Sequence, residues 1–267
     1  LSKQFGEKHL LSNVSFEILA GQKIGLIGPN GCGKTTFLKM LTREEPPTQG
    51  TLSISQGVKA GYFDQGHLSL NLDHTLLEEV LRDHKDLSEE DAKALLGQFN
   101  FRGTTIENTV GSLSGGERAR LAFLRLIMEA SNLLLLDEPT NHMDNESKDA
   151  IETALNTYTG TVIVVSHDRK FLDTVTDTIF FMTDADLKTY TGNYTQFRRQ
   201  RQKELTDYTA RDLAYLSASG VTKYRVTKGF TIWTIKKKHV IGEEIYIGDH
   251  NRNLYDWAIK GGLLKEI

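Results

Sequence analysis

A phosphate-binding loop is indicated by the stretch Gly28-Pro29-Asn30-Gly31-Cys32-Gly33-Lys34-Thr35. Four residues separate its first glycine from a Gly-Lys-Thr triplet, which is the spacing that holds nucleotide phosphates. Backbone N–H groups must turn inward toward phosphate oxygens, so glycine is needed where a Cβ would clash or where φ is positive. We expect Lys34 to reach the β- and γ-phosphates and the Thr35 hydroxyl to bind Mg²⁺.

Two acidic residues that suit phosphoryl transfer stand together at the end of a predicted buried strand. Asp137 and Glu138 follow the continuous apolar run 133–136. Hydrolysis of a phosphate ester needs Mg²⁺, charge stabilisation and a positioned water. We expect Asp137 to hold Mg²⁺ directly or through water. We expect Glu138 to act as general base or to orient the water, a role worth about two to four powers of ten in rate.

A further anion site is predicted in the stretch Leu113-Ser114-Gly115-Gly116-Glu117. The Ser114 hydroxyl and the N–H groups at the start of a helix are suitable donors for an oxygen anion. Taken alone, the phosphate-loop pattern has a structural alternative, which is a glycine-rich turn with an incidental lysine. Cys32 occupies a variable position of the loop, and no base-like residue is next to it, so we assign it no catalytic role.

The elements that must position these residues alternate between strands and helices. Strands are expected at 1–5, 13–19, 23–27, 51–55, 60–63, 133–136 and 162–165. Helices are expected at 36–41, 76–85, 89–99, 146–155 and 195–216, with another that Ser114 opens and that ends near 128. This alternation predicts an α/β fold with a parallel sheet. The two helices within 76–99 form a small insert on a mixed sheet core.

The composition is that of an ordinary globular protein, with 39% hydrophobic and 25% charged residues among 267. It allows one large domain and a small one. No run of 18 apolar residues occurs, so no segment is expected to span a membrane. With one cysteine, an internal disulfide is excluded. Leu1 is not Met and the first pattern begins part-way through, so we expect a fragment of a longer chain.

The charge is distributed unevenly along the chain. Residues 1–188 hold 18 Lys and Arg against 27 Asp and Glu, a balance of −9, whereas residues 189–267 hold 14 against 8, a balance of +6. The change in character predicts three parts: a nucleotide-binding domain at 1–190, a basic helical linker at 191–216 and a small β-rich domain at 217–267. The basic end is a candidate polyanion contact, and a solvated charged surface is the alternative.

The motifs together resemble the ATP-binding-cassette (ABC) ATPases, because five of them occur in that family's order over residues 1–190. They are the phosphate loop, Gln65, the stretch 113–117, the Asp137-Glu138 strand end and His167. Two further stretches resemble the ABC-F subfamily, namely Pro139-Thr140-Asn141-His142-Met143-Asp144 and Tyr190-Thr191-Gly192-Asn193-Tyr194. Met143 replaces the usual Leu. The resemblance implies a P-loop NTPase-type cassette and identifies this one as the second of the two that such proteins hold.

The resemblance also implies roles for single residues. Gln65 would contact Mg²⁺ or the attacking water, and His167 would be the switch histidine at the γ-phosphate. Phe5 stands where the family places an aromatic ring against adenine, although a core position is the alternative. The residues expected to contact ATP are Phe5, Gly28, Pro29, Asn30, Gly31, Cys32, Gly33, Lys34, Thr35, Thr36, Ser114, Gly115 and Gly116, and those expected to hold Mg²⁺ are Thr35, Gln65 and Asp137.

In this family the Ser114 stretch faces the ATP on the opposite cassette, so the resemblance implies a site completed by a second cassette. It implies a cytoplasmic Mg²⁺-dependent ATPase in which ATP-driven cassette closure acts on the ribosome, as a translation factor or in antibiotic resistance. An ATPase subunit of a membrane transporter is the alternative. Aromatic residues among the cations of 189–267, such as Trp233 beside 236–238, suit RNA or, equally, the core of a small domain.

Overall fold

The computed structural model describes residues 1–64, 70–141, 143–183 and 185–204, together with the backbone of five strands within 222–266. The chain divides into two compact units, Leu1–Arg199 and Gln200–Ile267, and each is described by itself. The finer division of the chain at 190 and 216 stays a prediction from sequence.

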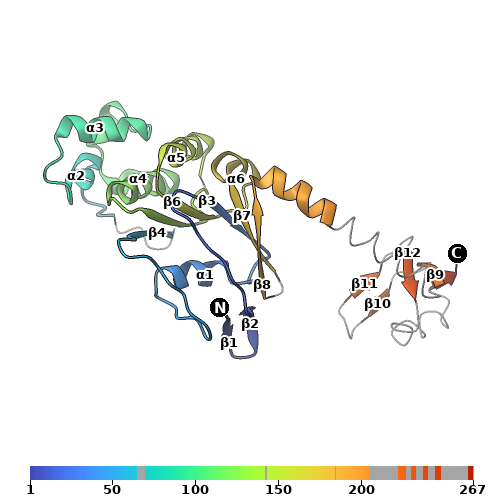
Figure 1. Ribbon diagram of the computed structural model, residues 1–267. Helices are drawn as coiled ribbons and strands as arrows, with labels where there is room; N and C mark the ends of the chain where they lie inside the picture. The colour runs from blue at the N-terminus through green and yellow to red at the C-terminus, as the bar shows by residue number, and fades with distance from the viewer. Residues whose placement is uncertain are drawn as a thin grey trace. The chain divides into compact units, whose positions relative to one another are not determined.

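A six-stranded sheet is the centre of the first unit (Figure 1), and its spatial order is β4-β5-β6-β3-β7-β8. Neighbouring strands are parallel except for β7 and β8, which pair antiparallel. The predicted mixed α/β sheet is therefore confirmed. The strands are β3 Lys23–Ile27, β4 Ala60–Asp64, β5 Leu133–Asp137, β6 Thr161–Val165, β7 Thr178–Thr183 and β8 Asp186–Thr191.

Helices cover both faces of this sheet (Figure 1). One face carries α1 Lys34–Leu41, and the other carries α4 Gly115–Met128, α5 Asn145–Thr157 and α6 Arg169–Val175. The insert contains α2 Leu76–Leu81 and α3 Glu89–Gln98, and 3₁₀ turns follow at Gly103–Glu107 and Val110–Ser112. Successive side chains of a strand point to opposite faces. Accordingly, Leu133 and Leu135 pack with α1, whereas Leu134 and Leu136 pack with α4, α5 and α6. The continuous apolar run was correctly predicted to be a strand buried on both faces.

The helical insert formed by α2 and α3 belongs to the same apolar core as α4. Leu76 and Val80 of α2 and Leu96 of α3 are fully or almost fully buried in the cluster that also contains Phe123. The predicted helix 76–85 is shorter in the structure, because α2 ends at Leu81. The chain then turns, and the side chains that follow take part in polar contacts with α4.

Two predicted strands near the N-terminus are absent. Residues 13–19 and 51–55, all within the described part of the chain, have no strand assignment, whereas a short hairpin forms from β1 Lys3–Phe5 and β2 Lys8–Leu11. The predicted alternation of burial is present, since Val14 is buried and Phe16 and Ile18 pack partly buried against the α1 side of the core. Alternating burial shows only which side of the segment packs against the core. A β-strand also needs backbone hydrogen bonds to a neighbouring strand.

The second unit is β-rich, as predicted. A three-stranded antiparallel sheet has the order β12-β9-β13, and a separate antiparallel hairpin joins β10 and β11. The strands are β9 Thr222–Val226, β10 Phe230–Ile232, β11 Lys237–His239, β12 Glu244–Ile247 and β13 Leu264–Glu266. Before them, residues 194–204 are helical, which confirms the start of the predicted basic helix. Its continuation to 216 and the side chain of Trp233 lie outside the described residues.

Candidate functional site

The predicted phosphate loop connects β3 to α1 and has the backbone that the glycine pattern requires. Gly31 has φ +74° and Gly33 has φ +110°, both in the left-handed region that favours glycine. Gly28 is needed for a different reason: a Cβ added there would lie 2.2 Å from the carbonyl oxygen of Met182 on β7. The loop therefore runs close to the neighbouring strand and leads into the N-terminus of α1, whose N–H groups attract anions.

The loop lysine is folded back onto the loop. Lys34 is buried, and its Nζ donates hydrogen bonds to the carbonyl oxygens of Gly28 at 2.9 Å and Pro29 at 3.1 Å. These bonds hold the ammonium group over the loop concavity, where phosphate oxygens would lie. A buried ammonium needs such partners, because an unpaired charge away from water is costly.

Thr35 and Asp137 meet although they are 102 residues apart. The Thr35 hydroxyl donates a 2.6 Å hydrogen bond to Asp137 Oδ2, so the first turn of α1 is joined to the carboxyl end of β5. Hydroxyl and carboxylate oxygens are ligands that Mg²⁺ accepts, and this ion usually keeps several waters and binds phosphates as well. The pair therefore fits the Mg²⁺ role predicted for both residues.

Glu138 follows directly and lies in an unusual environment. Its backbone has φ +51° and its N–H bonds the Val165 carbonyl at 2.9 Å, which anchors the turn after β5 to the end of β6. Oε1 is buried and accepts no well-aligned hydrogen bond from the described residues, although His167 Nε2 is an ion-pair partner 3.4 Å away. Burial raises the pKa of Glu138 and the Asp137 charge adds to the rise, whereas His167 and Lys34 oppose it.

A strained backbone and a carboxylate oxygen without a well-aligned donor are features that concentrate at functional sites. Glu138 shares one cleft with the loop and the strand ends. This cleft has a volume of about 440 Å³, and its walls are Phe5, Lys8, Leu10, Asn30, Gly31, Gly33, Lys34, Thr35, Thr36, Asp137, Glu138, Val165 and His167. The structure thus brings together residues that were predicted to contact adenine, phosphate, Mg²⁺ and water.

Phe5 and His167 lie at the edges of this cleft. Phe5 is 48% exposed, so it is not a core residue, and the ammonium of Lys3 lies 4.6 Å from its ring centroid. An exposed ring with one stacked face is available for a base on the other. The side chain of His167 is 63% exposed and follows β6, and the next residue, Asp168, caps α6. Their roles as adenine contact and switch residue stay predictions.

Six of the residues predicted to contact ATP do not line this cleft. Gly28, Pro29 and Cys32 belong to the phosphate loop itself, whereas the other three lie at the start of α4. Ser114 caps α4, and Gly115 and Gly116 begin the first turn of that helix. Ser114 Oγ accepts the Glu117 N–H, and the Glu117 carboxylate accepts the Ser114 N–H at 2.8 Å. This capping box leaves the next N–H groups of the helix start available for an anion. It also lowers the pKa of Glu117 through the hydrogen bonds from Ser114.

Gln65 lies outside the described residues, so the structure gives no position for it. Conversely, Lys8 lines the cleft without having been predicted, and its Nζ is 3.6 Å from where a Cβ on Gly31 would be. It comes from the β1–β2 hairpin, and no strand was predicted at 8–11. The signal available in the sequence was a lysine, Lys8, between the predicted strand 1–5 and the phosphate loop. Lys8 adds a second positive charge beside the predicted phosphate position.

Among the described residues, no group of three or more His, Cys, Asp or Glu side chains could hold a metal ion alone. The described helices are also all too short or too polar to cross a lipid bilayer.

Residues 11–141 match the ABC transporter family. Over 207 residues the chain is 42% identical to ABC transporter F family member 5 of Arabidopsis thaliana, a match that covers 75% of this chain and 30% of the relative. It is 37% identical over 210 residues to the energy-dependent translational throttle protein EttA of Escherichia coli K12, covering 77% of this chain and 38% of that protein. The chain thus spans well under half the length of these relatives.

A solved structure supports the fold independently. The ATP-binding cassette MJ0796, determined as a dimer in a post-hydrolysis state bound to ADP and Pi, matches with a TM-score of 0.55 and 22% identity. The match covers 71% of this chain and 94% of that one. Identity at this level supports the architecture of the first unit and carries no information on the ligand of this chain.

Proposed function

Because the chain belongs to the ABC-F family of ATP-binding cassette ATPases, we propose that its first unit binds and hydrolyses Mg²⁺-ATP between two cassettes and thereby acts on the ribosome in the cytoplasm. The observation that carries the ATPase part is the cleft itself. Lys34, the Thr35–Asp137 pair and the buried oxygen of Glu138 all meet there.

Five side chains of the cleft have chemical tasks in this proposal. Lys34 and the loop N–H groups bind the β- and γ-phosphates and withdraw charge from them. Thr35 and Asp137 would hold Mg²⁺, which neutralises charge that develops on the phosphate oxygens. Glu138 accepts the proton of the water whose oxygen attacks the γ-phosphorus, as the bond from that phosphorus to the ADP oxygen breaks. His167 stabilises the attacked phosphoryl group from the exposed side.

The proposal includes a second cassette because Ser114 does not line the cleft of its own chain. In a head-to-tail pair, the start of α4 from one copy would close over the phosphates bound by the other. A helix N-terminus with free N–H groups suits that task. In the full-length protein the partner would be the other cassette, and for this chain alone it would be a second copy.

The composite site predicts that ATP hydrolysis per chain rises with protein concentration. At low concentration single chains bind ATP without a partner helix start, so turnover should be poor, and it should reach a plateau once pairs form. Steady-state phosphate release across a dilution series, with the oligomeric state measured at each concentration, tests this. The Glu138→Gln chain gives the background. A constant rate per chain from a protein that stays monomeric would contradict the composite site.

The ribosome part rests on the name of EttA, a translational throttle, and on the basic charge after residue 188. Arg198 and Arg199 are exposed on the helix at 194–204. Contacts to phosphates release counterions, so affinity should fall by about 0.7–0.9 log units per log unit of salt for each phosphate neutralised.

We therefore expect the chain to sediment with ribosomes and not with lipid vesicles, with a steep salt dependence. Replacing Arg198 and Arg199 by Gln, or deleting 217–267, should weaken ribosome binding and make the salt slope shallower. Both variants should bind ATP as the unchanged chain does, and this measurement serves as the folding control. Equal ribosome binding by all three proteins at every salt concentration would remove the basic end from this role. Binding to vesicles instead would favour the transporter alternative.

A further inference from the structure

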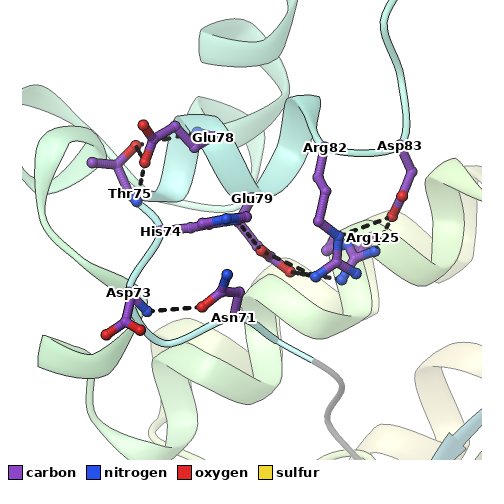
Figure 2. Close-up of polar contacts among 9 residues, drawn as sticks. All are labelled: Asn71, Asp73, His74, Thr75, Glu78, Glu79, Arg82, Asp83 and Arg125. Carbon is purple, nitrogen blue, oxygen red and sulfur yellow. Dashed lines mark hydrogen bonds and ion pairs between the residues drawn. The ribbon is translucent and has the colours of Figure 1, made fainter.

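A charged cluster in the helical insert contains a carboxylate that is completely removed from water. Glu79 lies on α2, and its side chain is 0% exposed. Figure 2 shows three side chains converging on it: His74 Nδ1 at 3.0 Å, Arg82 Nη1 at 3.1 Å and Arg125 Nη1 at 2.7 Å. A buried carboxylate carries a desolvation penalty of several kcal/mol unless such partners satisfy its oxygens. The three partners therefore compensate for the removal of the Glu79 carboxylate from water.

Of these three partners, Arg125 comes from a different element. His74 and Arg82 are near Glu79 in sequence, whereas Arg125 is 46 residues away, on α4. Its second guanidinium nitrogen bonds Asp83, just beyond the end of α2 (Figure 2). The planar guanidinium thus joins two carboxylates of the insert at once, which fixes its orientation as well as its distance.

Arg125 lies on the helix that Ser114 begins. The two residues are eleven positions apart, which is three turns or about 16 Å along an α-helix. A helix of this length transmits rotation as a rigid body, and the capping box fixes Ser114 on its first turn. Whatever sets the rotation of α4 at Arg125 therefore also sets where Ser114 and the N–H groups of Gly115 and Gly116 point.

We propose that Glu79 is a positioning residue: through Arg125 it holds α4 in the rotation that directs the Ser114 end at the phosphates bound by a second copy of the chain. The inference rests on the composite site proposed above and adds the residue that aligns it. It predicts that Glu79 acts in trans, because the helix start it orients serves the nucleotide of the partner.

Mixed pairs test this directly. One chain, the reporting chain, keeps Glu138, and the other, the silent chain, carries Glu138→Gln; two different affinity tags isolate the mixed pair. Hydrolysis then occurs on the loop of the reporting chain against Ser114 of the silent chain. Glu79→Gln in the silent chain should lower kcat about 10- to 100-fold, the range for a misaligned reacting group. The KM for ATP should change less than about twofold. The same substitution in the reporting chain should leave kcat within about twofold.

A second variant separates alignment from folding. Glu79→Gln alone removes the buried negative charge that faces Arg125, whereas Glu79→Gln with Arg125→Met removes both charges of this pair and should regain stability in urea unfolding. If alignment is the role, this double variant in the silent chain still hydrolyses slowly despite its recovered stability. Glu89→Gln, which breaks the exposed 3.6 Å pair with Lys93 on α3, is the matched control and should change neither quantity.

The outcomes are distinct. Loss confined to the silent chain and retained in the double variant supports the proposal. Equal loss in either position, recovery of rate together with stability, or no loss in either position would overturn it and leave Glu79 with a purely structural role. If the mixed pair with native Glu79 does not hydrolyse ATP at all, the composite ATPase site itself is refuted, and the alignment role with it.

Discussion

A chain carrying Glu138→Gln is expected to bind ATP as the unchanged chain does and to hydrolyse it about 10²–10⁴-fold more slowly. The amide has the shape of the carboxylate and can occupy the same buried position between His167 and the strand end. It cannot accept the proton of the attacking water. With ATP bound and not consumed, the pair of cassettes should stay closed and retain nucleotide.

Turnover and nucleotide retained after gel filtration measure the two halves of this expectation. Glu152 offers a matched control, because burial on α5 also raises the pKa of this carboxyl group and it lies outside the cleft. Glu152→Gln should hydrolyse ATP at the normal rate. Near-normal turnover by Glu138→Gln would remove Glu138 from the role of base, whereas loss of both binding and turnover would indicate a structural defect.

The strands that carry the site were predictable because their sequences are simple. The runs at 133–136 and 162–165 are apolar throughout, as expected for parallel strands covered on both faces. Asp137 and Glu138 were assigned because they follow such a strand, whereas His167 was assigned from the family resemblance; in the structure all three line the cleft.

The antiparallel edge of the sheet and the helical insert were less predictable. β7 and β8 were not expected, although Ile179–Met182 is as apolar as the predicted strands. Without β7, the need for glycine at position 28 could be attributed to phosphate approach alone, whereas the structure adds a neighbouring carbonyl oxygen.

The Glu79 cluster shows a different limit. In sequence, Glu79 is an acidic residue in the first turn of a short helix, and such a residue is normally exposed. Its burial depends on a guanidinium group from α4, and no local pattern links the two positions. Long-range pairs of this kind become visible only when the packing of the insert against α4 is known. The residues predicted to contact nucleotide belong to recognisable sequence motifs. A residue that positions such a motif, as proposed for Glu79, belongs to none.

Gly28→Ala is expected to weaken ATP binding about 10- to 100-fold, equivalent to about 1.4–2.8 kcal/mol. The added Cβ would lie 2.2 Å from the Met182 carbonyl oxygen and 2.9 Å from Cys32 Sγ. The oxygen belongs to the backbone of a paired strand and cannot move away cheaply. The loop must shift instead, and it would carry with it the Gly28 carbonyl that holds Lys34. Overpacking of this type also lowers the free energy of unfolding by about 1–3 kcal/mol.

Gly97 provides the matched substitution. It lies in α3, has no atom within 4 Å of an added Cβ, and has no positive φ. Gly97→Ala should therefore stabilise the fold by about 0.5–1 kcal/mol and leave ATP binding unchanged, since alanine is the better helix former. Equilibrium titration with a fluorescent ATP analogue and urea unfolding measure both quantities for each variant. If Gly28→Ala binds the analogue as tightly as Gly97→Ala does, the close approach to β7 does not set the geometry of the loop.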